Sequence, residues 1–384
     1  MQSRIVKLSI LLMVFALTYC VEPYVPEGVR ENPDFLVVDG FINASNNTAT
    51  VKLTKAVGLN AEGTAPTVMD ANVTIESSSG EIFALLYSLE NGGSYNGPIA
   101  VDYTKKYKLR IDLGFSGKEY ESDLIEIQKV PEIESVNLQF DDDALRFMVN
   151  TSPSEESSKY YRWRFDETWE FTSTYFSSYL LEGGQARLRT SAENINKCYR
   201  TDPSSSINVA STQSLVTNSV KNFEIHAVDR GSIKLWRRYS MNVQQFALTE
   251  EAYSYWLKLY KTNENVGSLF DPMPGQVIGN IRSTRDPNEV VIGFFSGSMV
   301  SEKRIFITSQ DMPEDYSTYR PMRCQLDTIA IEFIPLTPEN VLLVGPVYSE
   351  GGIPQIVAYT SAPPTCVDCV SYGGGSIKKP DFWP

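Results

Sequence analysis

Two cysteines near the C-terminus, Cys366 and Cys369, have the spacing of a redox or zinc-binding motif. A redox pair lies at the start of a helix, which lowers the pKa of its first thiol, but the Val-Ser-Tyr-Gly-Gly-Gly stretch at 370–375 predicts no helix. Zinc requires a second pair of ligands, and Cys198 and Cys324 are widely separated single cysteines. We therefore expect these four cysteines to form disulfides in an oxidising compartment. The sequence does not choose among the three possible pairings.

His226 is the only histidine of the chain, which limits both acid–base catalysis and metal binding. It lies in the stretch Phe-Glu-Ile-His-Ala-Val at 223–228, where alternate side chains are apolar and His226 points to the other face. We interpret it as a histidine on a strand surface. The motifs of serine hydrolases, zinc proteases and phosphate-binding loops are absent from the sequence.

Paired carboxylates need no local motif, because a glycosidase uses two acids roughly 5 to 10 Å apart from any part of the chain. The best candidates are Asp166, Glu167 and Glu170, which stand beside tryptophans. A hydrolase based on them is a minor alternative. We expect a protein that is not an enzyme, with no catalytic residue, no metal and no cofactor.

Cys20 has the setting of a lipid attachment site. Basic Arg4 and Lys7 precede an apolar run, residues 8–19, and Cys20 follows it directly. The run has the length of an export signal and is too short to cross a bilayer comfortably. Its end, Leu-Thr-Tyr-Cys, resembles a bacterial lipobox, although Tyr19 replaces the usual small residue. We expect acylation of Cys20, with an ordinary or uncleaved signal peptide and an incidental cysteine as the alternatives.

The composition excludes one class of partner. The chain has 384 residues, 34 Lys and Arg, 47 Asp and Glu, and a net charge of −13. No basic cluster stands out in this acidic sequence, so nucleic acid, which binds clustered cations, is not an expected partner. The 21 Tyr and 18 Phe residues favour a folded, mainly β protein.

The sequence divides into five segments. Residues 1–19 are the predicted signal peptide, and residues 20–31 hold the lipidated Cys20 and an extended tether with two prolines. Residues 32–129 alternate apolar and polar side chains over six or seven short strands, which predicts an immunoglobulin-like β-sandwich. A second β-rich, sandwich-like domain follows at 130–362, beginning at a Val-Pro seam, and a Cys- and Gly-rich tail occupies 363–384.

Within the second domain we expect one amphipathic helix near 249–262. Thr249 is a plausible N-cap, Glu250 and Glu251 suit the first turn, and apolar residues then follow at helical spacing. The alternating Tyr161, Trp163 and Phe165 could form a shelf for a sugar or peptide, but a sandwich core requires the same pattern and is favoured. Another apolar run, 290–295, predicts a buried strand.

Several stretches resemble a family of Bacteroidetes outer-membrane lipoproteins known only as a domain of unknown function. At the C-terminus, the similar residues are Cys366-Val-Asp-Cys369, Gly373-Gly374 and Lys-Pro-Asp-Phe-Trp at 379–383. Further similar stretches are Leu-Val-Val-Asp-Gly at 36–40, Tyr239-Ser240, Gln245, Tyr255-Trp256, Gly-Ser-Leu-Phe-Asp-Pro at 267–272 and Gly-Asn-Ile at 279–281.

This resemblance implies a lipoprotein of the bacterial outer membrane, exposed at the cell surface and encoded beside a TonB-dependent receptor of the SusC-like kind. It implies no chemistry and no site residue. We therefore expect a non-catalytic accessory or ligand-binding partner of a TonB-dependent transporter, with a small-molecule, glycan or peptide ligand possible. The alternative is a structural or adhesive surface lipoprotein.

Overall fold

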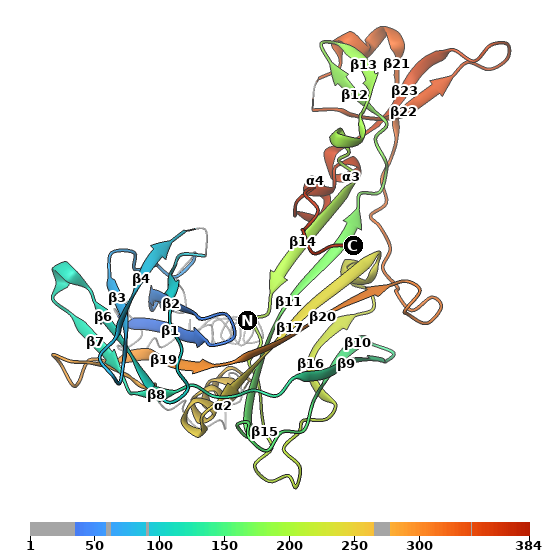
Figure 1. Ribbon diagram of the computed structural model, residues 1–384. Coiled ribbons are helices and arrows are strands. Elements are labelled where there is room, and N and C mark those ends of the chain that lie inside the picture. Colours follow the sequence, from blue (N-terminus) through green and yellow to red (C-terminus); the bar gives the residue numbers. More distant parts are fainter. Residues whose placement is uncertain (1–34, 59–62, 90–91, 265–276, 339) are drawn as a thin grey trace, which may run out of the picture.

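The structure, a computed structural model, describes residues 35–384 except 59–62, 90–91, 265–276 and 339 (Figure 1). The predicted signal peptide, Cys20 and the tether lie outside the described residues. The described chain is mainly β with several sheets, as predicted. In Figure 1 the first strands form one body and the middle of the chain forms a second, from which an arm projects.

The first body is built on a sheet of ten strands. Their order is β18-β7-β6-β3-β4-β5-β2-β1-β19, with β8 beside β6. The strands are β1 (Leu36–Asn43), β2 (Thr48–Lys55), β3 (Asn72–Ser77), β4 (Ile82–Ser88), β5 (Ser94–Pro98), β6 (Lys106–Asp112), β7 (Glu119–Ser122), β8 (Ile125–Glu126), β18 (Ile281–Ser283) and β19 (Val291–Ser298), and a short 3-10 helix, η2 (Gly114–Ser116), precedes β7.

Alternating apolar residues place one face of these strands inside. Val51 and Leu53 of β2 and Ile75 of β3 are fully buried, which is the burial that a period of two residues predicts. The first part of β4 pairs with β3 and the last part pairs with β5. The sheet can therefore fold around one shared apolar core, to which both of its halves contribute.

Strands from distant parts of the chain complete this sheet. β19 runs parallel to β1, with Leu36 opposite Val291 and Asn43 opposite Ser298, and β18 pairs with β7. The buried strand predicted at 290–295 is thus confirmed. The sheet is not confined to residues 32–129, because residues 281–298 supply two of its strands. The immunoglobulin-like arrangement is not confirmed, since the strands follow one continuous path.

The second body packs two sheets face to face around one core. One sheet has the order β16-β10-β9, and the other has the order β14-β11-β17-β20 with β15 beside β11. The strands are β9 (Ile133–Phe140), β10 (Ala144–Thr151), β11 (Tyr160–Thr172), β14 (Lys197–Pro203), β15 (Asn208–Ser211), β16 (Phe223–Asp229), β17 (Arg238–Leu248) and β20 (Val300–Thr308), and η4 (Ile233–Leu235) precedes β17. Tyr161, Trp163 and Phe165 are buried in this core, so the core interpretation is confirmed.

Helix α2 (Glu250–Glu264) lies between the two bodies, where the sequence predicts a helix. The Thr249 hydroxyl accepts a hydrogen bond from the amide of Ala252 at 3.2 Å, as an N-cap does. Ala252 and Tyr255 are buried, and the Tyr255 ring lies 5.2 Å from that of Phe294 on β19. The apolar face of the helix therefore packs against a strand of the first body.

The arm combines two separate segments, residues 179–188 and 327–362. Its strands are β12 (Tyr179–Glu182), β13 (Gln185–Leu188), β21 (Asp327–Ala330), β22 (Leu342–Tyr348) and β23 (Ile356–Ala362), with η5 (Ile331–Leu336) after β21 and η3 (Ser191–Glu193) after β13. Ile334, Leu343 and Tyr359 form its small buried core. Figure 1 shows the arm extending beyond the end of β11 and β14.

The C-terminal tail returns from the arm to the second body. It contains two short helices, α3 (Pro364–Val367) and α4 (Cys369–Gly373), so the second domain and tail contain more than the one predicted helix. The prediction that no helix follows Cys369 is wrong, because the Asp368 side chain caps the amide of Val370 and allows a single turn.

Candidate functional site

The three candidate carboxylates all lie on β11, but they do not form a catalytic pair. Asp166 and Glu170 share one face and are four residues apart, which separates them by about 13 Å along a strand. Glu167 points to the other face. Glu170 forms an ion pair with Lys197 at 3.0 Å. These three residues therefore do not provide the carboxylate spacing of a glycosidase.

Glu167 instead occupies the centre of a buried polar cluster. Its carboxylate accepts hydrogen bonds from the Lys234 ammonium and, at 2.9 Å, from the Tyr239 hydroxyl, and it lies 3.4 Å from Nε2 of His226. Burial alone would raise the pKa of Glu167, but the neighbouring His226 imidazole and the hydrogen-bonded Lys234 ammonium outweigh burial and lower the pKa to about 2. With this pKa, the carboxylate of Glu167 stays ionised at neutral pH. It is poorly suited to act as a general base, because a general base works best with a pKa near the working pH.

His226 does not lie on the strand surface, so that interpretation is wrong. Its ring packs between those of Phe147 and Phe165, with centroids 6.2 and 4.6 Å away. The reason is a shift of register: His226 pairs with Phe147, whereas Glu224 pairs with the next residue, Met148. The extra residue on β16 is a bulge, which reverses the alternation of inward and outward side chains after it. The cluster therefore joins β16 of one sheet to β11 of the other.

The four cysteines form two disulfides, Cys198–Cys369 and Cys324–Cys366, with Cα atoms 5.6 and 6.0 Å apart. The prediction of disulfides is confirmed, and the structure selects one of the three pairings. The two cysteines of the Cys-x-x-Cys motif thus bond to different partners rather than to each other. No thiol of the four remains for redox exchange or for zinc.

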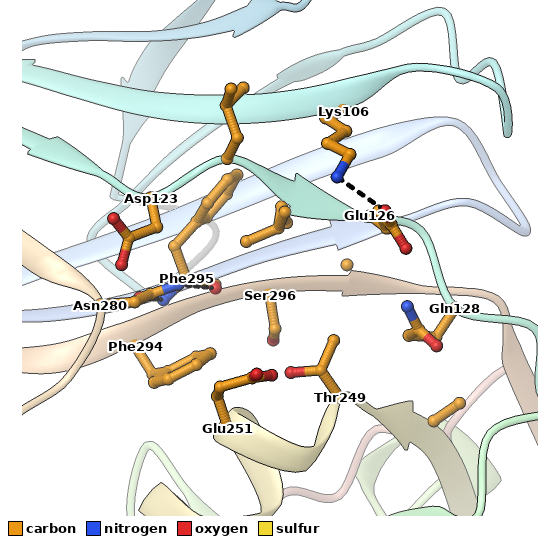
Figure 2. Close-up of a pocket in the computed structure, with 14 residues that line it drawn as sticks. Lys106, Asp123, Glu126, Gln128, Thr249, Glu251, Asn280, Phe294, Phe295 and Ser296 are labelled. Atoms are coloured by element: carbon orange, nitrogen blue, oxygen red, sulfur yellow. Dashed lines mark hydrogen bonds and ion pairs between the residues drawn. The ribbon is translucent and has the colours of Figure 1, made fainter.

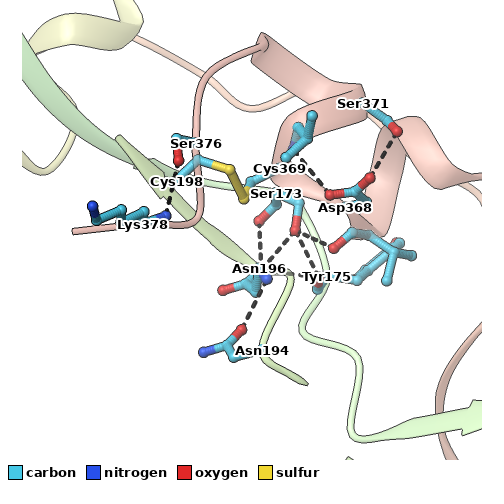
Figure 3. The surroundings of a disulfide bond; sticks show 12 residues. Ser173, Tyr175, Asn194, Asn196, Cys198, Asp368, Cys369, Ser371, Ser376 and Lys378 are labelled. Atoms are coloured by element: carbon cyan, nitrogen blue, oxygen red, sulfur yellow. Dashed lines mark hydrogen bonds between the residues drawn. A yellow bond between two sulfur atoms is a disulfide. The ribbon is translucent and has the colours of Figure 1, made fainter. Parts of the chain in front are cut away.

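Hydrogen bonds around Cys198–Cys369 fix the tail to the base of the arm (Figure 3). The side-chain amide of Asn196 donates to the Ser173 hydroxyl at 2.7 Å and to the Tyr175 carbonyl at 3.0 Å. The Ser173 hydroxyl in turn donates to the Val367 carbonyl at 2.6 Å. The second disulfide closes a loop from Cys324 to Cys366 that contains the larger segment of the arm. Both disulfides therefore hold the arm where it leaves the second body.

Residues of the family-like stretches have structural roles. A Cβ atom on Gly279 would stand 1.5 Å from the Gly293 carbonyl oxygen, so only glycine permits this contact. The Gln245 side chain is buried, where it donates to the Pro131 carbonyl and accepts from the Trp163 indole, both at 2.8 Å. The stretch 267–272 lies outside the described residues. The described positions stabilise the fold, and none of them converges on a reactive centre.

A cleft of about 390 Å³ lies where β8, β19 and the start of α2 meet (Figure 2). Lys106 and Glu126 form an ion pair at 2.8 Å on one wall, and Glu251 stands on the opposite wall. Phe294 and Phe295 contribute apolar surface. The cleft has room for a small polar ligand, but Asp123 pairs with Arg282 outside it, Lys106 and Glu126 pair with each other, and Glu251 suits a helix start.

The arm presents the most distinctive surface of the described structure. Seven of its large apolar side chains are exposed, whereas only three are in its buried core. The exposed residues are Leu188, Ile331, Phe333, Leu336, Tyr348, Ile353 and Val357, with Ile353 at 84% and Leu336 at 78% exposure. These residues come from β13, η5, β22, β23 and the connection between β22 and β23, so exposed apolar side chains are frequent throughout this small arm. Large exposed apolar surfaces mark interaction sites. We call these seven residues the arm surface.

The charges of the arm are almost entirely acidic. Residues 324–377 contain no Lys, Arg or His, and Asp327, Glu332 and Glu350 are exposed. The other segment of the arm contains Arg187, which is held in ion pairs by Glu182 and Glu193. This long run without a cation is visible in the sequence alone and is a signal of an unusual segment.

Among residues placed by the structure, no three His, Cys, Asp or Glu side chains gather closely enough to bind a metal ion. Within those residues, every helix is too short or too polar to cross a bilayer.

A comparison with protein families gives a match over most of the chain. The model of a family described as a domain of unknown function, DUF4249, matches residues 21–304. No curated protein matches the chain. The matched region covers the first body and most of the second, and ends before the larger segment of the arm.

Proposed function

Since this chain belongs to the DUF4249 family, a domain of unknown function, we propose a role for it from its own residues. It is a lipid-anchored protein of the bacterial outer membrane, of Bacteroidetes type and exposed at the cell surface. It acts as a non-catalytic accessory partner of a TonB-dependent transporter. The observation that carries the proposal is the arm surface, which lies beyond the end of β11 and β14 on an arm with two disulfides at its base.

The chemistry of the arm surface favours a protein over a lipid bilayer as its occupant. A surface that inserts into an anionic bilayer pairs its apolar residues with Lys and Arg. The arm has acidic residues beside its apolar ones, and Arg187 is already neutralised by two glutamates. The complementary partner is a protein surface with an apolar centre and a basic rim.

Lipid attachment at Cys20 supports the location. Stable anchoring requires more than one acyl chain, as in a processed bacterial lipoprotein. The tether predicted after Cys20, with prolines at 23 and 26, would separate the folded bodies from the lipid. A protein tethered in this way meets membrane partners at high effective concentration, so a modest arm surface is sufficient for association.

Co-purification of the full chain in mild detergent tests this role. We expect the chain to bring down a TonB-dependent transporter, identified by mass spectrometry. The double variant Leu336→Ser/Ile353→Ser should lose at least nine-tenths of it. The control Leu215→Ser/Val216→Ser removes two other exposed apolar side chains, at a turn of the second body, and should retain it.

The outcomes separate the alternatives. A chain that never brings down a transporter would exclude the proposed role. If deletion of the gene weakened surface attachment or envelope integrity while uptake stayed normal, the structural or adhesive function would be favoured instead.

A further inference from the structure

A second cleft, of about 480 Å³, lies near the tail at the base of the arm, where β11 and β20 end and β14 and β17 begin. Its lining is mainly polar and comes from five separate stretches of the chain. The charged lining residues are Glu170, Lys197, Arg237, Arg238 and Lys379, and the others include Trp236, Ser309, Gln310, Trp383 and Pro384.

The charge of this cleft is opposite to that of the protein. Four cations face one carboxylate, Glu170, which is already paired with Lys197 at 3.0 Å. Across the described chain, Arg237, Arg238 and Lys379 take part in no ion pair. Three positive charges remain in excess, and two remain if a terminal carboxylate on Pro384 is counted. Like charges gathered without counterions repel one another, so the arrangement favours bound anions.

The cationic residues of the cleft lie on well-packed parts of the chain. Arg237 lies over the ring of Trp236 at 4.5 Å, and Arg238 begins β17, opposite Glu170 on one side and Thr308 on the other. Trp383 is only 4% exposed and packs against Tyr199 at 5.5 Å, which positions the tail that contributes Lys379. The backbone positions that contribute the cations are therefore fixed by the fold before any ligand arrives, which lowers the entropic cost of binding.

We propose that this cleft binds the phosphate group of a phosphate monoester. A dianion offsets the excess charge better than a carboxylate does, and guanidinium groups match the geometry of phosphate oxygens. Ser309 and Gln310 are exposed at the rim and add neutral hydrogen-bonding groups. The Thr308 hydroxyl donates to Asp311 at 2.7 Å, so it is already engaged within its own turn. This site is independent of the arm surface and of the proposed transporter partner.

Calorimetric titration of the full chain in detergent, at low and constant ionic strength, tests the site. The probes are glucose 6-phosphate, inorganic phosphate, glucose and the water-soluble diester glycerophosphoglycerol. We expect glucose 6-phosphate and inorganic phosphate to bind. We expect glucose not to bind, and the diester to bind more weakly than either phosphate probe. Tighter binding of the diester would overturn the proposal in favour of a lipid headgroup, and no binding of either of the first two probes would overturn it outright.

Paired variants distinguish the cleft from general attraction of anions. Arg237→Gln/Lys379→Gln removes two exposed cations of the cleft and should weaken glucose 6-phosphate binding at least tenfold. Lys258→Gln/Lys261→Gln removes the same charge from exposed positions on α2 and should change binding less than twofold. Equal weakening in both variants would overturn the assignment to this cleft. Matching unfolding temperatures would show that both variants fold.

Discussion

The side chain of Asn280 pairs with the backbone of Phe295 as a neighbouring strand would. The Phe295 amide donates to Oδ1 of Asn280, and Nδ2 of Asn280 donates to the Phe295 carbonyl, both at 2.8 Å (Figure 2). One side chain thereby satisfies both backbone groups on this edge of β19. Together with the close contact of Gly279 and Gly293, it joins β18 to β19.

Replacing Asn280 with Ala should therefore destabilise the fold. The Phe295 N–H and C=O would lose their partners, and unsatisfied backbone groups of this kind cost about 1–3 kcal/mol. Denaturant unfolding of the full chain measures the change. Asn137→Ala, on the exposed face of β9, is the control and should alter the free energy of unfolding by less than about 0.5 kcal/mol. Similar values for the two variants would contradict the role given to Asn280.

The Glu167 cluster predicts a specific loss of stability in acid. The folded pKa of Glu167 is about 2 and the ordinary value is 4.5, so the ionised form stabilises the folded state. The contribution, about 3 kcal/mol, is complete above pH 4.5 and is lost as the pH falls towards 2.

Glu167→Gln removes this dependence. The difference in unfolding free energy between wild type and Glu167→Gln should be largest near neutral pH and should shrink by roughly three-fifths of the ionisation contribution at pH 3. Glu155→Gln changes an exposed carboxylate and should show no such trend. A difference between wild type and Glu167→Gln that stays constant from pH 7 to pH 3 would rule out the cluster as its source.

The two disulfides should contribute unequally to stability. Cys198–Cys369 spans 171 residues and Cys324–Cys366 spans 42, so loop closure predicts about 5 and about 4 kcal/mol. The variants Cys198→Ser/Cys369→Ser and Cys324→Ser/Cys366→Ser should both unfold at lower denaturant concentration, the first more than the second. Proteolysis of the second variant should begin within the arm. If neither variant differed from wild type, the disulfides would not be what holds the arm and tail.

Cys20→Ser should prevent lipid attachment. Mass spectrometry of the wild-type protein should find Cys20 acylated at the mature N-terminus, and the protein should fractionate with outer membranes. The variant should instead keep its signal or appear in soluble fractions. An unacylated wild-type Cys20, with the mature protein free in the medium, would contradict the proposed location.

Local patterns predicted local structure well. Alternation at Val51 and Leu53 specified a half-buried strand because each side chain's face depends only on its neighbours in sequence. The Thr249 cap and the acidic first turn similarly predicted the start of α2. The same alternation failed at His226, because a single extra residue in β16 reversed the faces, and a bulge leaves no mark on the hydrophobic period.

The same local patterns could not predict which distant segments of the chain pair with each other. The pairing of β1 with β19 joins strands about 250 residues apart, and nothing near Leu36 indicates its partner. The disulfide pairing, likewise, depends on how the tail returns along β14. The arm could have been suspected, since residues 324–377 contain no cation and many apolar residues. Its projection from the body depends on contacts between two distant segments, so only the structure places it.

The most direct test of the account is a photo-crosslinking residue placed at Ile353 in living cells. We expect one dominant adduct with a TonB-dependent transporter of the outer membrane, identified by mass spectrometry. The same residue at Leu86, which is 75% exposed on β4 of the first body, should give no such adduct. Transporter adducts of equal yield from both positions, or none from Ile353, would contradict the claim that the arm surface is where this protein meets its partner.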